Sequence, residues 1–375
     1  MASALFSPLV LGPRTLANRI AIAPMCMYSA DDGSATDWHI HHWTSLGISG
    51  AAMVTIEATG VERRGRISHG CLGLYSDANE ASARRALEVA RRFSPQTTVF
   101  GIQLGHAGRK ASTQRPFEGG GPLPASEDAW QTVGPSAIAF APGYPVPEAL
   151  DEAGIAGVIA AFVQAAKRAE RAGFDFVELH GAHGYLLHQF LSPISNHRTD
   201  RWGGSLENRM RLIVTIAREV RAALPAHMFV GARLSASDWV DNGFQLEDAI
   251  AVSKALKAEG VVYICASSGG NVHHAKIPVG PLYQAHFAEA IQREAGISTR
   301  AVGMITHPDE AEALVASGRA DMVALARAIL ADPRWPWRAA TELGATMVPI
   351  VDQYARSEAT LRHWVARPAA RQTAA

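Results

Sequence analysis

The chain alternates between short runs that are almost continuously apolar and longer Ala-rich stretches in which apolar residues recur every three or four positions. Continuous apolar runs are typical of strands that are covered on both faces, whereas the wider spacing predicts amphipathic helices. Eight runs of the first kind are expected to be strands, at residues 18–25, 51–61, 97–105, 174–181, 228–235, 260–268, 299–305 and 321–327.

Helical patterns lie between most of these strands. The clearest are ANEASARRALEVARRF (78–93), EAGIAGVIAAFVQAAKRAERAG (152–173) and LEDAIAVSKALKAEG (246–260), and the last two end in glycine, a common helix stop. Eight βα repeats predict an α/β fold, namely a closed (β/α)8 TIM barrel. A doubly wound open sheet is the main alternative, but no G-x-G-x-x-G pattern follows the first strand.

Two segments fall outside this repeat. Between about Gly105 and Leu150, after the third strand, the chain is rich in Gly, Pro, Ser and polar residues. A connection of this length is usually a functional lid or carries small elements of its own. We therefore expect a single barrel domain over residues 1–340, with a lid-like excursion, and a C-terminal tail over residues 341–375 that ends in a disordered ARPAARQTAA.

Composition narrows the range of partners. Hydrophobic residues make up 48% of the chain and charged residues 19%, which fits a large buried core. The 35 Lys and Arg residues equal the 35 Asp and Glu residues in number, whereas a nucleic-acid-binding protein usually carries a basic excess or a basic stripe. The sequence therefore predicts no nucleic-acid partner.

Cysteine usage and the N-terminal segment predict a cytoplasmic protein. Cys26, Cys71 and Cys265 are scattered and odd in number, as in reduced intracellular proteins. The segment MASALFSPLVLGPRTLANR lacks the charged and then apolar pattern of a signal peptide. No run reaches the ~18–20 apolar residues of a membrane span, so no membrane partner is expected.

Polar residues gather at the C-terminal ends of the predicted strands, where barrel enzymes carry their chemistry. His180, His183 and Tyr185 follow the fourth strand. The two histidines could bind a metal together with Cys26 or Glu57, as in a metal-dependent hydrolase, or could stabilise a loop. They could also aim two N–H donors at a substrate oxygen, which requires no metal and is the interpretation that we favour.

Tyr185 and Cys26 are the other candidates for chemistry. A phenol has a pKa near 10 and stays protonated at neutral pH, which suits Tyr185 to protonating a carbanion or enolate. Cys26 ends the first strand, two residues before Tyr28, and this position predicts a role in the site. A free cysteine is otherwise usually a small buried hydrophobic residue.

Three residues further along the chain indicate a cofactor. Arg233 on the fifth strand could be an ion-pair partner in the barrel mouth, or it could stabilise a negatively charged cofactor ring. Arg327 ends the eighth strand, where barrels commonly bind phosphate, and Gly303 on the seventh strand allows a close backbone approach. These positions predict a phosphate-bearing cofactor without saying which one.

The stretch HGAHGYLLHQFLSPISNHRTDRWGGSLENRMR (180–211) resembles the signature of the old yellow enzyme family of FMN-dependent ene-reductases. APMCMYS, IEATGV and QLGHAGRKA also resemble motifs of this family, and the similarity extends over essentially the whole barrel, from LANRIAIAPM to LARAILADPRWP. Cysteine at position 26 followed by Tyr28 resembles the bacterial branch with xenobiotic reductases and thermostable ene-reductases. The classical branch carries threonine in place of Cys26.

The resemblance implies non-covalent FMN at the top of the barrel. Arg233 would then lie near the negative end of the flavin ring, Gln103 would bind its pyrimidine edge, and Cys26 would tune its redox potential without acting as a covalent nucleophile. The residues expected to contact FMN are Ala23, Pro24, Met25, Cys26, Ala58, Gln103, His180, Arg233, Gly303, Ala326 and Arg327.

The resemblance also implies the reaction. His180 and His183 would hold the carbonyl or nitro oxygen of an activated alkene, Tyr28 would help close the pocket, and Tyr185 would protonate the α-carbon as hydride reaches the β-carbon. NADPH, or NADH, would be the reductant. A different FMN barrel enzyme, of the dihydrouridine-synthase type, and a non-catalytic flavin carrier are alternatives.

Two residues differ from the family's usual pattern, and one C-terminal segment matches only some of its members. This chain has Ala326 before Arg327 where the family commonly has glycine, and Trp202 where tyrosine is usual. We expect altered packing at the first and a structural role at the second. Gln353-Tyr354-Ala355-Arg356 resembles a segment that reaches a neighbouring subunit's active site in some bacterial members, although this chain continues well beyond it. A homo-oligomer, dimer or larger, is therefore expected.

Overall fold

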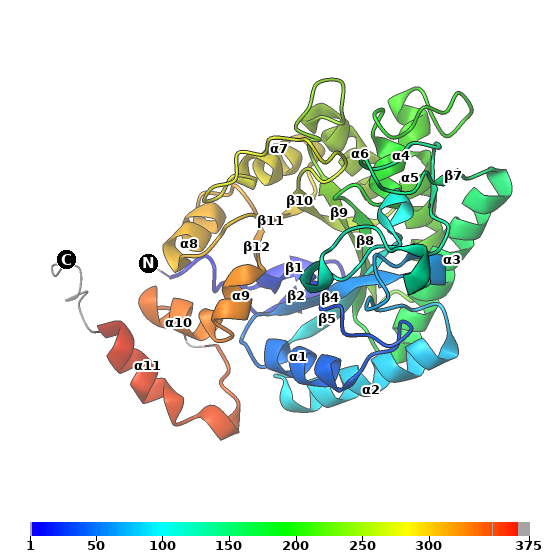
Figure 1. The fold of residues 1–375 in the computed structure, drawn as a ribbon. Coiled ribbons are helices and arrows are strands. Elements are labelled where there is room, and N and C mark those ends of the chain that lie inside the picture. Colours follow the sequence, from blue (N-terminus) through cyan, green and yellow to red (C-terminus); the bar gives the residue numbers. More distant parts are fainter. Residues whose placement is uncertain (1, 347, 367–375) are drawn as a thin grey trace, which may run out of the picture.

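The computed structural model describes residues 2–346 and 348–366. Its centre is a closed barrel in which neighbouring strands are parallel (Figure 1). In chain order the barrel strands are β3 (Ile20–Ile22), β4 (Met53–Gly60), β5 (Val99–Gly105), β8 (Phe176–Gly181), β9 (Phe229–Ser235), β10 (Val261–Ser267), β11 (Ser298–Ala301) and β12 (Met322–Leu325).

The barrel confirms the predicted (β/α)8 fold, and the doubly wound alternative is wrong, because β12 pairs with β3 and closes the sheet. Each expected strand has a counterpart, although β3 and β11 are much shorter than the apolar runs suggested. The helices are α1 (Asp37–Gly47), α2 (Asp77–Phe93), α3 (Glu152–Ala172), α4 (Leu186–Leu191), α5 (Leu206–Ala223), α6 (Leu246–Ala258), α7 (Ala285–Ala295), α8 (Pro308–Ala316), α9 (Arg327–Ala331), α10 (Trp335–Glu342) and α11 (Ser357–Ala366).

Local sequence signals define the ends of several helices. The side chains of Ser76, Asp151 and Ser205 each accept a hydrogen bond from a backbone N–H in the first turn of α2, α3 and α5, respectively. Helix α3 ends at Gly173, whose φ of +96° gives the left-handed turn that glycine adopts without steric cost.

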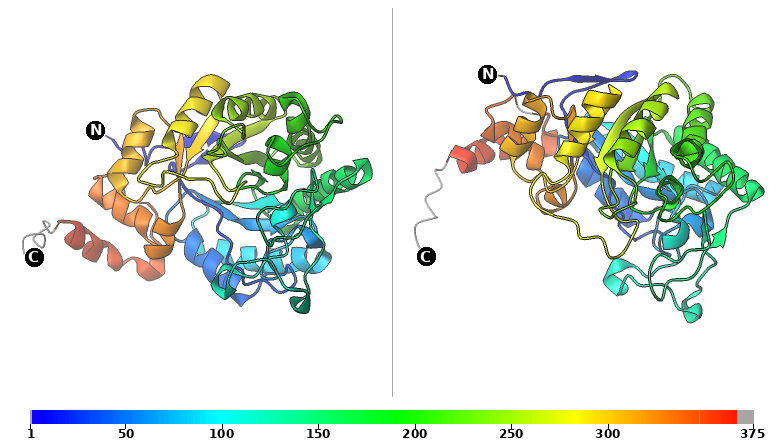
Figure 2. Two further views of the ribbon diagram at one scale, coloured as in Figure 1. Left: turned by 45° about the horizontal axis from the view of Figure 1, so that its top comes forward. Right: turned by 90° about the horizontal axis from the view of Figure 1, so that it is seen from above.

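A hairpin that the apolar pattern did not predict closes the lower end of the barrel. Strands β1 (Leu9–Leu11) and β2 (Arg14–Leu16) pair antiparallel, and Leu11 and Leu16 pack into an apolar cluster with Phe176 and Phe229. The two phenyl rings stack with centroids 4.8 Å apart. The hairpin and the long excursion lie at opposite ends of the barrel (Figure 2, right).

The excursion runs from the end of β5 to the start of α3, as expected. It contains the 3-10 helices η2 (Gly108–Lys110), η3 (Pro116–Glu118) and η4 (Ala125–Glu127) and the two-residue strands β6 (Val133–Gly134) and β7 (Glu148–Ala149). Arg109 attaches this segment to the barrel, because its Nη2 donates to the carbonyl oxygen of Asn271 at 2.7 Å.

The C-terminal part leaves the barrel after α10. A 3-10 helix, η5 (Asp352–Tyr354), leads to α11, which lies away from the barrel wall (Figure 1). The Trp364 side chain of α11 is 67% exposed. The terminal segment expected to be disordered begins in the last turn of α11, and residues 367–375 of it lie outside the described residues. Within the described residues, no helix is long and apolar enough to cross a membrane.

Candidate active site

A tight turn after β8 brings the two histidines and Tyr185 together. His183 adopts a left-handed backbone with φ +59°, and its N–H donates to Ser235 Oγ at 2.9 Å. Gly184 is required next to it, because an added Cβ would lie 2.2 Å from the carbonyl oxygen of Gly270. The His180 ring therefore lies 5.2 Å from the His183 ring and 5.0 Å from the Tyr185 ring, centroid to centroid, and is nearly perpendicular to both.

A hydrogen bond within the turn favours one tautomer of His180, and the partner of His183 lies on β10. The Ala182 N–H donates to His180 Nδ1 at 3.3 Å, which leaves the proton of a neutral ring on Nε2. His183 Nε2 lies 2.7 Å from Ser267 Oγ. When Ser267 donates in this bond, the His183 proton is on Nδ1. Each imidazole then has one N–H that no atom of its own turn accepts.

Burial sets the charge of these three side chains. It lowers the pKa of His180 and of His183 well below the usual histidine value, and the nearby Arg233 charge adds to the effect. Burial also raises the pKa of Tyr185 well above that of a free phenol. At neutral pH the site therefore holds two uncharged imidazoles and a protonated phenol.

Cys26 and Tyr28 lie beside a buried carboxylate. The register between β4 and β5 shifts by one residue between Ile56 and Ala58, so Glu57 forms a β-bulge. Its carboxylate accepts from the Met27 N–H, and its Oε1 lies 3.0 Å from Nε2 of the buried His39. Glu57 thereby fixes the segment that carries Cys26 and Tyr28.

This environment keeps Cys26 in its thiol form. Burial raises the pKa of Cys26 well above the usual cysteine value, and the nearby Cys71 and Glu57 raise it further. Burial likewise raises the pKa of Tyr28, with Cys26 as the next contribution. A thiol that does not ionise is a poor nucleophile, so the chemistry here does not favour covalent catalysis by Cys26.

A hollow of about 380 Å³ beside the histidines fits a flavin with a phosphate. It is lined by His183, Arg233, Gly303, Ala326 and Arg327, together with residues after β10 and β11. Arg233 is 8% exposed, and its Nε is buried without a hydrogen-bond partner among the described residues. Its Nη2 reaches Ser267 Oγ at 3.4 Å, and no described carboxylate forms an ion pair with it. A buried guanidinium without an anionic partner is costly, so it indicates an anionic ligand. These residues therefore fit FMN, which the family resemblance implied.

The Gln103 amide is oriented by a polar cluster inside the barrel. Its Nε2 donates to Glu178 Oε1 at 2.8 Å, and Glu178 also accepts from Arg300 and, at 2.6 Å, from the Tyr263 hydroxyl. No described residue donates to Gln103 Oε1. Gln103 therefore presents an acceptor to a ligand, which matches the imide N–H at the pyrimidine edge of a flavin.

Other expected site residues lie around the same rim. Ala58, His180 and Tyr185 line one small hollow, and Tyr28 and Tyr185 line another of about 150 Å³. Ala23 and Met25 line a separate hollow with Trp43 under α1, and Pro24 lies between them in the sequence. Arg327 is exposed and lies in the first turn of α9.

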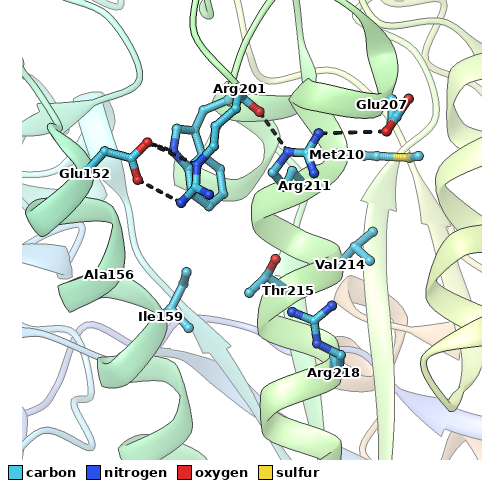
Figure 3. Close-up of a pocket in the computed structure, with 11 residues that line it drawn as sticks. Glu152, Ala156, Ile159, Arg201, Glu207, Met210, Arg211, Val214, Thr215 and Arg218 are labelled. Atoms are coloured by element: carbon cyan, nitrogen blue, oxygen red, sulfur yellow. Dashed lines mark hydrogen bonds and ion pairs between the residues drawn. The ribbon is translucent and has the colours of Figure 1, made fainter.

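Another groove, of about 410 Å³, lies between α3 and α5 on the outside of the barrel (Figure 3). Trp202 is buried beneath it and donates its indole N–H to Glu152 Oε1 at 2.8 Å, beside an Arg201–Glu152 ion pair of 2.9 Å. Figure 3 contains none of the rim histidines or tyrosines. This groove is therefore separate from the candidate active site.

A metal-dependent hydrolase would need a third ligand beside the histidine pair. In the described part of the chain, no three His, Cys, Asp or Glu side chains are placed to hold a metal ion.

Sequence analysis missed three contributors to this site. Ser267 and Glu178 lie on strands and orient His183 and Gln103. Lys110 donates to the carbonyl oxygens of His183 and Gly270 at 2.9 and 2.8 Å. Lys110 belongs to the quoted motif QLGHAGRKA, and the basic pair Arg109-Lys110, shortly after the end of β5, was the available signal.

Comparison with known proteins agrees with this geometry. Residues 4–345 match the family described as NADH:flavin oxidoreductase / NADH oxidase. An NADPH dehydrogenase of Geobacillus sp. (strain WCH70) is 43% identical over 358 residues, which cover 95% of this chain and 99% of that protein. The NADPH dehydrogenase of Bacillus subtilis (strain 168) is 42% identical, with the same coverage. The structure of morphinone reductase is similar with a TM-score of 0.75 and 26% identity, over 94% of this chain and 93% of that one.

These similarities confirm the predicted barrel, the resemblance to old yellow enzyme and the reaction class. The protein is an FMN-dependent NAD(P)H oxidoreductase of the ene-reductase type, and the dihydrouridine-synthase and hydrolase alternatives are set aside. The chain belongs to the NADH:flavin oxidoreductase / NADH oxidase family.

Proposed function

We propose that this protein reduces the activated C=C bond of α,β-unsaturated carbonyl or nitro compounds. The observation that carries the proposal is the convergence of two neutral imidazoles and a protonated phenol, His180, His183 and Tyr185, at the open end of the barrel. These are the groups that hydride addition to an enone requires, because the reaction develops negative charge on oxygen and leaves the α-carbon to be protonated.

The histidines act on the oxygen. The free N–H groups of His180 and His183 both donate to the carbonyl or nitro oxygen, and their bonds strengthen as charge develops there. A donor of this kind typically contributes about 3–4 kcal/mol to transition-state stabilisation. Because both rings are uncharged, they hold the oxygen without adding a full positive charge to the ground state.

Tyr185 provides the proton. Its raised pKa keeps the hydroxyl protonated at the pH of the reaction, so the proton is available to the α-carbon. A general acid in position typically accelerates a reaction by about 10²–10⁴-fold. Tyr28 closes the substrate pocket, and the Cys26 thiol lies beside the cofactor and tunes its potential without covalent chemistry.

Non-covalently bound FMN would supply the hydride that adds to the β-carbon. Arg233 and Arg327 would hold its negatively charged groups, and the Gln103 acceptor would take its imide N–H. The remaining contacts are assigned to Ala23, Pro24, Met25, Cys26, Ala58, His180, Gly303 and Ala326.

The proposal includes the division of the chain into a domain and a tail. Residues 1–340 form the catalytic domain, and residues 341–375 form a tail that joins copies of the chain into a homo-oligomer. The position of α11 away from the barrel and its exposed Trp364 support this role. The partners are small activated alkenes rather than nucleic acid or membrane, and the protein acts in the cytoplasm.

One spectrum tests the proposal. We expect flavin absorption bands in the purified protein and a new long-wavelength band when a para-substituted phenol is added, because the histidine pair holds the phenolate over the flavin. An enone should then be reduced in steady state, and parallel assays with NADPH and NADH give the preferred reductant. A flavoprotein that neither binds phenols nor reduces enones would overturn the proposal.

A further inference from the structure

A second hollow next to the histidine turn is lined by several polar side chains. Its volume is about 150 Å³, and it is lined by Tyr28, Tyr185, Lys110, Gln114 and Tyr144 together with apolar and small residues. It shares both rim tyrosines with the reaction site, and its outer wall comes from the excursion. Among the described residues that line it, none is acidic and Lys110 is the one with a charged side chain.

Lys110 retains a hydrogen-bond donor for a ligand. Of the three N–H groups of its ammonium, one donates to the carbonyl oxygen of His183 at 2.9 Å and one to that of Gly270 at 2.8 Å. The ammonium lies 4.5 Å from the centre of the Phe140 ring and 5.2 Å from the centre of the Tyr185 ring, and both are favourable cation–π distances. No Asp or Glu in the described part of the chain forms an ion pair with it. The third N–H therefore has no oxygen or nitrogen acceptor among the described residues and is available to an anionic ligand beside the reaction site.

The surroundings of Lys110 leave its charge without a counterion. Neighbouring titratable and charged groups come from η2, the excursion, the segment after β3 and the turns after β8 and β10, and are Arg109, Tyr144, Tyr28, His180, His183, Tyr185 and His273. None of them is an anion at neutral pH. Burial, followed by the Arg109 charge, lowers the pKa of Lys110 to about 8, so the ammonium predominates at pH 7.

We propose that Lys110 forms an anion-binding subsite that selects activated alkenes carrying a carboxylate at a second position. This inference rests on the proposed function, and adds a substrate class to it. The unsaturated carbonyl or nitro group occupies the histidine pair, and the carboxylate accepts the free N–H of Lys110. Charge-assisted bonds of this kind are about twice as strong as neutral ones, so the acid is preferred over an uncharged analogue.

Lys110 also holds the His183 turn against the segment after β10, and a test must separate this structural contribution. Loss of the clamp would weaken every ligand of the histidine pair, whereas loss of the subsite would weaken only the anionic ones. The informative quantity is therefore a ratio. It compares kcat/KM for a cyclohexenone with a carboxylate on the ring carbon farthest from the carbonyl with kcat/KM for the corresponding carboxamide.

The experiment measures this ratio in the FMN-loaded protein with saturating reductant. We expect the wild type to prefer the acid by about tenfold or more, Lys110→Met to lose the preference and Lys110→Arg to retain most of it. Lys254→Met removes an exposed lysine on α6 and serves as the matched control, with an unchanged ratio.

The pH profile of the wild type gives a second, independent measurement. The carboxylate of the substrate stays ionised from about pH 6 to 10, whereas Lys110 loses its proton as the pH rises through about 8. The preference for the acid should therefore decline above pH 8 in the wild type. This measurement needs no variant, so it decides the matter if Lys110→Met does not fold.

The outcomes are distinct. An equal ratio in the wild type and Lys110→Met, with both substrates reduced, would leave Lys110 as a clamp and overturn the subsite. If Lys110→Met reacts more slowly with NADPH but keeps its preference for the acid, Lys110 binds the reductant and not the substrate carboxylate. That result would also overturn the subsite. Failure of the wild type to reduce either substrate while FMN is bound would instead contradict the proposed function.

Discussion

Two buried arginines lie on the two strands that flank β10, and their surroundings differ. Arg233 on β9 and Arg300 on β11 both pair across β10 with Cys265. Arg300 is fully buried, donates to the Glu178 carboxylate and also donates to Thr55 Oγ1 at 3.0 Å. Among the residues that the structure describes, Arg233 has no carboxylate partner, and its Nη2 donates to Ser267 Oγ at 3.4 Å.

The contrast separates structural charge from functional charge. A buried cation with its own carboxylate completes a polar cluster inside the barrel, and this cluster orients Gln103. A buried cation without one keeps an unfavourable free energy that a negatively charged ligand can relieve. We therefore expect changes in the interior cluster to alter folding stability, and changes at the rim to alter ligand binding.

The largest effect is expected from His180→Ala combined with His183→Ala, which removes both oxygen donors at the rim. Each donor typically contributes about 10²–10³-fold to kcat, so enone reduction should fall by about 10⁴-fold or more. Phenol binding, measured from the long-wavelength band, should be lost while FMN is largely retained. Unchanged phenol affinity in this variant would contradict the assigned oxygen site.

Glu178→Gln breaks the interior pair and leaves Arg300 without its carboxylate. Breaking a buried ion pair typically costs about 3–5 kcal/mol, so the free energy of unfolding of the apoprotein should fall by this amount in urea denaturation. Adding Arg300→Met removes the orphaned charge and should restore much of the loss. A single variant as stable as the wild type would show that Arg300 and Glu178 are not coupled.

Arg233→Met should have a smaller effect, and this effect should be on FMN binding and not on folding stability. Removing an unpaired buried charge should leave the stability of the apoprotein unchanged or raise it. FMN affinity, measured by titrating the apoprotein while following flavin fluorescence, should fall by about 10²-fold, because a hydrogen bond to a charged group contributes about 1.5–3 kcal/mol. Arg233→Lys keeps the charge and should lose less. An apoprotein destabilised as strongly as Glu178→Gln would abolish the distinction between the two arginines.

Much of the fold could be predicted because the apolar runs are long and the helices end in clear signals. All eight barrel strands correspond to expected runs, and α3 ends at Gly173, as its glycine indicated. The hairpin β1–β2 was missed because each strand has only three residues and one of the three is exposed. Hydrophobic periodicity therefore predicts long buried strands and helices better than short, partly exposed strands such as β1 and β2.

The site could be predicted where neighbouring residues in the sequence are also neighbours in space. His180, His183 and Tyr185 share one turn, so their spacing alone predicted that they converge. Glu178 acts through Gln103, 75 residues earlier, and Lys110 binds the carbonyl oxygen of Gly270, 160 residues later. These partners become neighbours only when the barrel closes. A local sequence pattern contains no information about which distant residues closure brings together. The β-bulge at Glu57 was missed for a related reason, because it becomes visible only against its partner strand.

The N-terminal hairpin has a kinetic consequence. It covers the lower end of the barrel, and the Glu178 cluster fills the interior, so small molecules have to approach the cofactor site from the rim. Reductant and alkene therefore use the same opening, and we expect each to exclude the other from it. Turnover should then alternate between two half-reactions, one with the reductant and one with the alkene.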